Sequence, residues 1–261
     1  MQALENKGLV LRCFQNEPIL EAVCELRFVP RSETSGNLLP GMLQAHFGER
    51  FPTYQVTAVA SIPLALRQQD ANLKHAPTSR LMGQEGAINL GDNVVSLSLA
   101  GAATGVNKYP GWAQFKALAS SLFTVVLNTG LVERAERVSI KYVNLLKSDA
   151  TTSISALTNV SISFGEEQIG TQPLHLRTEF SSVGHATVVQ IAHPADVTTS
   201  SGEKLKGMIL EVDAVRTAPI SLGVTTLDEY LEAAHTEASK VFFRLLSANM
   251  TEQYEPIYEP G

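Results

Sequence analysis

The sequence lacks most of the features that identify a membrane, secreted or zinc-binding protein. Cys13 and Cys24 are its two cysteines, too few for a disulfide framework or for the four-ligand pattern of structural zinc. No apolar run reaches the roughly 18 residues of a membrane-spanning helix. The first residues, MQALENKGLVLRCF, lack the basic start and long apolar stretch of a signal peptide. We therefore expect a cytoplasmic protein with reduced thiols and no membrane partner.

Positive charge is also scarce. The chain has 20 lysines and arginines against 26 aspartates and glutamates, which gives a net charge of −6. A surface that coats DNA or RNA depends on clustered lysine and arginine, so this composition disfavours a nucleic-acid partner. Such a role would require these basic residues to gather on one face: Arg12, Lys108, Arg134, Arg137 and Lys141.

The common catalytic motifs are absent as well. The sequence has no G-x-S-x-G, no G-x-x-x-x-G-K-[ST], no H-E-x-x-H and no G-x-G-x-x-G. The glycine-bearing stretch 101–105, GAATG, lacks the lysine of a phosphate-binding loop. We therefore assign no catalytic residue, and we expect no metal and no cofactor.

What the sequence does contain is long amphipathic helices. The clearest spans residues 225–256, where Thr226 and Glu229 form a capping box that satisfies backbone amides of the first turn. Apolar residues then recur three or four positions apart: Leu227, Leu231, Ala234, Ala238, Val241 or Phe242, and Leu245. Such a face has to be buried, and we expect the strands upstream to receive it.

Two further helices are predicted. One runs from Trp112 to about Asn128, with Gly130 in the position of a left-handed cap just beyond its end. A shorter helix is predicted over residues 38–51, with Met42 and His46 on its apolar side.

The remaining pattern is typical of strands. Alternation of apolar and polar residues predicts a strand over residues 19–28, and VSIKYVNLL predicts another within residues 132–146. Further strands are predicted at residues 54–66, in three pieces within 80–99, and at 157–164, 174–180, 186–191 and 208–215. Residues 1–17 are expected to be a mixed lead-in, and the final EQYEPIYEPG to be a tail broken by prolines.

Runs of strands closed by a helix indicate an α+β fold. We predict two similar halves, residues 1–130 and 131–261, each an antiparallel sheet followed by a long amphipathic helix packed on one face. Residue identity between the halves is negligible, so this pseudo-duplication rests on the order of the elements alone. The sequence leaves open whether the two halves share one continuous sheet.

Six residues are candidates for a binding site: Tyr109, Trp112, Tyr142, Asn144, His235 and Tyr254. Trp112 is the single tryptophan and follows a rigid Tyr-Pro-Gly turn, and tryptophan is an efficient recognition residue. The alternative is that Trp112 packs into the core and that His235 is a partly buried, hydrogen-bonded histidine.

A second set of residues has the chemistry of a metal site or an acid/base pair. His175, His185 and His193 fall in one hairpin region, and Glu211 and Asp213 share one face of a strand. The same residues are equally compatible with surface histidines and with the solvated face of an amphipathic strand.

Short motifs along the chain resemble those of one known family. Glu17-Pro18-Ile19-Leu20-Glu21-Ala22 leads into Glu25-Leu26-Arg27-Phe28, and Tyr142-Val143-Asn144 closes a central strand. Leu227-Asp228-Glu229 is followed by His235, Phe242-Phe243 and Tyr254-Glu255-Pro256. In order and spacing these motifs resemble an uncharacterised, sporadically distributed prokaryotic family of about this length. The resemblance implies no catalytic residues, and the patchy distribution implies a mobile or defence-linked gene module.

These observations favour a non-enzymatic interaction protein that binds and regulates a protein partner, as an antitoxin-like or accessory component does. The first alternative is a small-ligand sensor with a pocket between sheet and helices, and the second is a hydrolase with a His/carboxylate site. A flat apolar patch would favour the first hypothesis, a deep apolar pocket the second, and converging histidines and carboxylates the third. A homodimer is left open.

Overall fold

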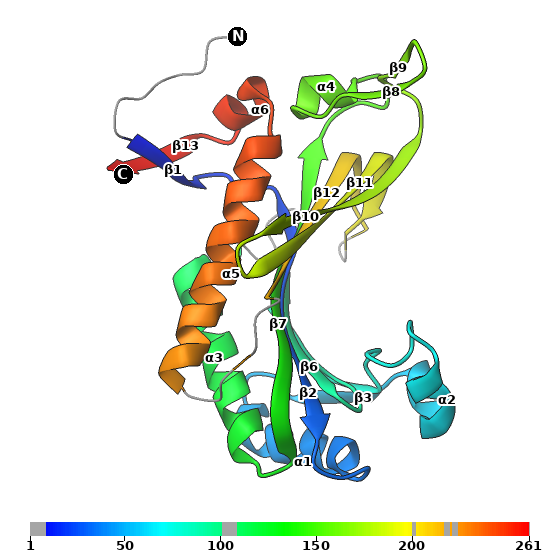
Figure 1. The fold of residues 1–261 in the computed structure, drawn as a ribbon, viewed down its shortest axis with the longest axis vertical. Coiled ribbons are helices and arrows are strands. Elements are labelled where there is room, and N and C mark those ends of the chain that lie inside the picture. The colour runs from blue at the N-terminus through cyan, green and yellow to red at the C-terminus, as the bar shows by residue number, and fades with distance from the viewer. Residues whose placement is uncertain (1–8, 101–108, 200–201, 217–219, 221–223, 261) are drawn as a thin grey trace.

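The computed structural model describes residues 9–100, 109–199, 202–216, 220 and 224–260. It is an α+β fold built on a nine-stranded antiparallel sheet, with two long helices on one face (Figure 1). The predicted fold class is confirmed at this level.

The first part of the chain forms β1 (Leu9–Phe14), β2 (Ile19–Pro30), α1 (Ser35–Phe47), β3 (Thr53–Val56), a short 3-10 helix (Ala58–Ser61), α2 (Leu64–Gln69), β4 (Ser79–Met82), β5 (Gly86–Leu90), β6 (Val94–Ala100) and α3 (Trp112–Asn128). The second part forms β7 (Val132–Lys147), α4 (Ile154–Leu157), β8 (Ile162–Phe164), β9 (Glu167–Ile169), β10 (Leu174–Ser182), β11 (His185–Thr198), β12 (Lys204–Arg216), α5 (Val224–Leu245), α6 (Ala248–Gln253) and β13 (Pro256–Pro260).

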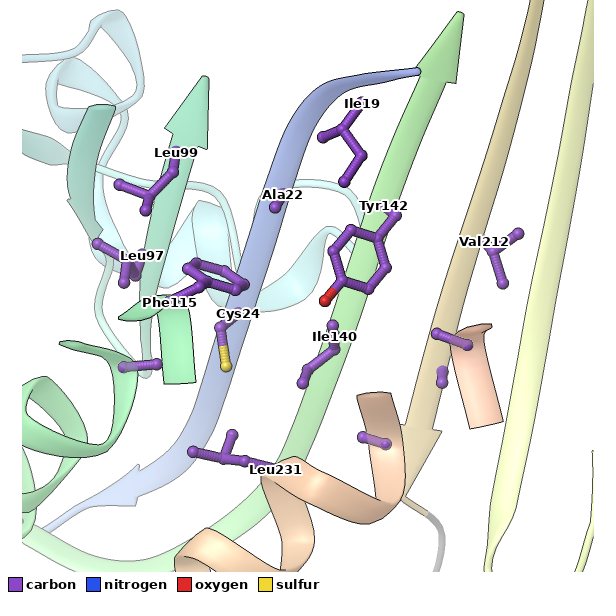
Figure 2. Packing of buried hydrophobic residues seen from close by; sticks show 14 of the residues in the cluster. Ile19, Ala22, Cys24, Leu97, Leu99, Phe115, Ile140, Tyr142, Val212 and Leu231 are labelled. Carbon is purple, nitrogen blue, oxygen red and sulfur yellow. The ribbon is translucent and has the colours of Figure 1, made fainter. Parts of the chain in front are cut away.

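The two long strands β2 and β7 pair at the centre of the sheet and join the two parts of the chain. Cys24 lies opposite Ile140 and Leu26 opposite Val138, and all four side chains are fully buried. Figure 2 shows Cys24 and Ile140 side by side on the face that α3 and α5 cover. The question that the sequence left open is therefore answered: the two parts share one continuous sheet.

Strand order follows one rule on both sides of this central pair. The first part runs outward as β2-β6-β5-β4-β3 and the second as β7-β12-β11-β10, so each first strand pairs with the last strand of its own part. A long helix follows in each case, α3 after β6 and α5 after β12. The parts differ in strand number and in their smaller helices, and the pseudo-duplication stays a prediction.

The helices α3 and α5 lie side by side on the same face of the sheet (Figure 1). Each presents the apolar stripe that its sequence predicts, and its buried members include Phe115 and Leu122 on α3 and Leu231, Ala234 and Ala238 on α5. Burial of one leucine or phenylalanine side chain contributes about 1.5–3 kcal/mol, so the stripes fix both helices on the sheet. None of the helices in the described part of the chain is long and apolar enough to cross a membrane.

The two ends of the chain form a structure that the sequence did not predict. β1 pairs with β13 in a separate antiparallel ribbon beside α5 (Figure 1). Phe14 at the end of β1 packs edge-on against Phe243 and Tyr254, with ring centroids 5.3 and 5.7 Å apart. The predictions of a mixed lead-in and of a proline-broken tail were therefore wrong. Each segment forms a strand by pairing with the other end of the chain, which no local pattern shows.

The predicted C-terminal helix was too long and began too late. It starts at Val224, so Thr226 lies inside the helix and is not its N-cap. It ends at Leu245, and the separate helix α6 follows, because the Ser247 hydroxyl accepts the backbone N–H of Met250 at 3.2 Å and caps a new helix. The helix 112–128 and the positive φ of Gly130 were confirmed.

Three other predictions needed correction. The strand expected over 54–66 ends at Val56, and the helix α2 follows directly after Pro63, a residue that is compatible with a helix start. Residues 154–157 are helical, so the strand expected over 157–164 is reduced to β8. The first helix covers Ser35–Phe47, and Met42 and His46 are exposed. The stretch 101–105 lies outside the described residues.

Candidate functional site

A cavity of about 350 Å³ lies on the helix-covered face of the sheet. Its floor is β7 and the start of β2, its sides are the N-terminal end of α3 and the C-terminal half of α5, and β1 and β13 border it. The residues that line it are Arg12, Cys13, Phe14, Glu17, Pro18, Ile19, Tyr109, Gly111, Trp112, Ala113, Tyr142, Asn144, His235, Ser239, Phe242, Phe243 and Glu259. The cavity is therefore largely aromatic, with a few polar groups set into its wall.

Five of the six predicted binding residues lie around this cavity: Tyr109, Trp112, Tyr142, Asn144 and His235. Tyr254 lies outside the lining and is buried behind Phe14. The sequence analysis did not predict four of the other lining residues, because it did not recognise the two chain ends as strands: Arg12, Cys13, Phe14 and Glu259. The apolar stretch LVLRCF is a β-type signal that could have indicated β1.

A chain of hydrogen bonds connects the floor of the cavity to α5. The Tyr142 hydroxyl lies 2.9 Å from Nδ1 of His235 and 3.4 Å from the Tyr109 hydroxyl. Ser239 sits four residues after His235 on the same helix face, with its Oγ 3.5 Å from the same Nδ1. This geometry fixes the orientation of both the Tyr142 and the His235 rings.

His235 also stacks on Trp112. The two ring centroids are 4.1 Å apart and the ring planes differ by 11°. Trp112 in turn donates its Nε1–H to Glu232 at 3.0 Å, and Lys116 donates to the same carboxylate oxygen at 2.7 Å. Although burial alone would raise the pKa of Glu232, these two donors lower it, and the ionised carboxylate holds the start of α3 against α5.

Three titratable groups in the cavity wall, His235, Tyr109 and Tyr142, are neutral at physiological pH. Burial lowers the pKa of His235 to about 4, and the smaller effects of Arg12 and Lys116 act in the same direction while Glu232 opposes them. Burial likewise raises the pKa of the Tyr109 and Tyr142 phenols. A protonated Tyr142 hydroxyl can then donate to Nδ1 of a neutral imidazole, with the ring proton on Nε2.

The charged lining residues come from the N- and C-terminal segments. Nε of Arg12 lies 3.6 Å from Oε2 of Glu259, and both side chains are more than half exposed. Burial and the nearby Glu17 and Glu259 raise the pKa of the Cys13 thiol, so Cys13 is protonated at neutral pH. Asn144 is fully buried at the floor and donates to the Leu210 carbonyl at 3.1 Å.

The second set of candidate residues does not converge. On the β10–β11 hairpin His175 lies opposite Ala192 and His193 opposite Leu174, so the two histidines point to opposite faces. His193 is buried and His175 is exposed. Within the residues that the structure describes, no group of three or more His, Cys, Asp or Glu side chains could hold a metal ion.

Glu211 and Asp213 share a strand face, as predicted, but they lie on the side of the sheet that α3 and α5 do not cover. Glu211 accepts from Gln190 at 2.6 Å, and Asp213 pairs with Arg137 at 3.1 Å. Burial raises the pKa of Asp213, and Arg137 opposes this. The carboxylates are therefore engaged in cross-strand pairs. Arg137 lies on this face and Arg12 on the cavity side, so these two basic residues do not gather on one face as a nucleic-acid partner would require.

The lowered pKa of His235 predicts a specific pH dependence of stability. An exposed histidine titrates near about 6.5, so the unfolded chain takes up the proton before the folded one does. The stabilisation is fully present above that pH and is lost as pH falls toward the folded pKa of about 4. Between about pH 7.5 and about pH 5 the natural chain should lose about 2 kcal/mol more free energy of unfolding than His235→Gln.

Urea unfolding of both proteins at the two pH values measures this difference. Every other titrating group is common to the two chains and cancels in the comparison. Equal losses of stability would show that His235 is not held neutral by burial.

No family model, no curated protein and no solved structure matches this chain. The resemblance stated from the motifs therefore stays a prediction. Some residues of these motifs line the cavity, namely Glu17 and Ile19, Tyr142 and Asn144, and His235.

Proposed function

We propose that this chain binds a small, largely apolar ligand in the cavity between the sheet and the helices. The observation that carries the proposal is an aromatic cavity of about 350 Å³ with a hydrogen-bonding group, His235, fixed in its wall. Small-molecule sites have this character, since they are concave and mostly apolar with a few oriented polar groups, and occupy about 300–1,000 Å³. The function would be that of a ligand-binding protein or sensor.

The electrostatics of the wall restrict the ligand further. His235 and the two phenols are neutral at physiological pH, and Arg12 and Glu259 pair with one another beside them. Arg12, Glu17 and Glu259, the charged lining residues, come from the terminal segments that border the cavity. A charge on the ligand placed beside His235 and the two phenols would face neutral groups and would lose its hydration without a counter-ion. The cavity therefore suits an uncharged molecule with an apolar body and one or two hydrogen-bonding groups.

Thermal-shift screening with uncharged aromatic fragments tests this proposal. A ligand at 100 times its dissociation constant should stabilise the fold by about 2.7 kcal/mol. Ser239→Leu should abolish the shift, because the larger side chain fills the cavity beside His235. Ser121→Leu is the matched control, since it makes the same substitution on an exposed position of α3 and should keep the shift.

Alkylation of Cys13 supplies an independent readout. Cys13 lines the cavity, whereas Cys24 is completely buried in the central sheet, so iodoacetamide should label Cys13 in the folded protein and a bound fragment should slow that reaction. A library without a single fragment that both shifts the melting temperature and protects Cys13 would contradict the proposal.

A second proposal, partner binding, is favoured by a different observation. β3 forms one edge of the nine-stranded sheet and all four of its residues are exposed, with Tyr54 and Val56 51% and 58% accessible. An exposed apolar edge can take up an extended segment of another protein as an additional strand. The cytoplasmic location and the antitoxin-like or accessory role that we attach to this proposal rest on the sequence and on the motif resemblance.

Val56→Lys tests the partner proposal, because a charge on an edge strand opposes strand addition. A protein captured stoichiometrically by the natural chain from its host should be lost with Val56→Lys and retained with Val10→Lys. Val10 is the matched control, since it is also 58% exposed and also lies on a strand. Loss of the partner with both variants, or with neither of them, would contradict the proposal.

The pseudo-duplication is proposed on structural grounds alone. The shared rule of strand order on the two sides of the β2–β7 pair, with a long helix after each set of strands, supports it.

A further inference from the structure

The opposite edge of the nine-stranded sheet is formed by β10. This strand has nine residues, compared with four in β3, and it pairs with β11 on one side only among the described residues. An edge strand presents a row of backbone N–H and C=O groups that can pair with another chain. In the part of the chain that the structure describes, β10 is the longer of the two edge strands that pair on one side only.

The side chains of β10 carry a particular charge pattern. Arg177 and Glu179 are two residues apart, so they share one face of the strand, and both are exposed. Within the described part of the chain neither makes an ion pair. Leu176, Thr178 and Phe180 occupy the other face. Leu176 packs against the core there, and the ring of Phe180, which is 39% exposed, lies 5.5 Å from the guanidinium of Arg244 on α5. Lysine alone would discourage strand pairing. Here one positive and one negative residue share a face, so two antiparallel copies of the strand can place each charge opposite its counterpart.

We infer that two copies of this chain associate through β10, antiparallel and related by a two-fold axis at Thr178. In this register Arg177 of one copy lies opposite Glu179 of the second copy, and the symmetry repeats the pair. Leu176 likewise lies opposite Phe180 of the second copy. Directly opposed residues in an antiparallel pair share a face and interact, so one register gives two ion pairs and two apolar pairs and joins the two sheets into one.

Neighbouring registers are disfavoured by the same residues. A shift of the second copy by two residues in one direction places Arg177 opposite Arg177, and the opposite shift places Glu179 opposite Glu179. A shift by one residue sets Leu176 opposite Glu179, which pairs an apolar side chain with a charged one. Like charges directly opposite each other are destabilising, so the pattern specifies a single alignment.

Charge exchange tests this interface. The full-length protein should show a monomer–dimer equilibrium in sedimentation over a dilution series. Arg177→Glu should raise the dimer dissociation constant by about tenfold, because two-fold symmetry converts both ion pairs into repulsive contacts. Glu179→Arg should have the same effect. The double variant Arg177→Glu with Glu179→Arg restores both pairs and should return the dissociation constant to its original value.

Arg80→Glu on β4 is the matched control. It changes the net charge by the same amount at an exposed strand position far from β10 in strand order, and it should leave the dimer unchanged. Urea unfolding of each variant separates a lost interface from a lost fold. A protein that is monomeric at every concentration overturns the inference, as does a dimer that the single variants do not weaken or the double variant does not restore.

Discussion

The pairing of β2 with β7 is the contact on which the rest of the structure depends. It joins the two parts of the chain and gives one face on which Cys24, Leu26, Val138 and Ile140 are fully buried. All the other strands of the large sheet extend outward from this pair. The helices α3 and α5 lie against each other on this face, α3 on β6 and β7 and α5 on β7, β12 and β11. Each helix buries an apolar stripe that would be unfavourable in water.

The cavity forms where the inward side chains of β7 change from aliphatic to polar along this same face. Val138 and Ile140 of β7 fill the space beneath the helices, but the next two inward positions are Tyr142 and Asn144, which are polar. Buried polar groups need partners, and these find them in His235 and in the Leu210 carbonyl. The space above them is closed by aromatic rings from α3, α5 and β1, so the polar groups lie in a mostly apolar wall.

The sequence predicted what local periodicity determines. The helix Trp112–Asn128, the long central strands and the β10–β11 hairpin carry their pattern within a few residues. It did not predict β1 and β13, whose pairing joins the two ends of the chain. The predictions of functional residues also succeeded where they rested on local features and failed where they needed a long-range register. Five cavity residues were named because their types suit recognition and their motifs stood out, whereas the His175/His193 hypothesis depended on a register that places the two side chains on opposite faces.

We propose that the space beside Trp112 and His235 is a ligand site. Because Trp112 is the single tryptophan, a ¹H–¹⁵N spectrum contains one indole Nε1 signal, and that signal reports on this site directly. We expect uncharged aromatic fragments to move it in a saturable way, together with the backbone amides of His235 and Tyr142. Fragments that bind the protein but leave the indole signal and both amides in place would contradict ligand binding at this site.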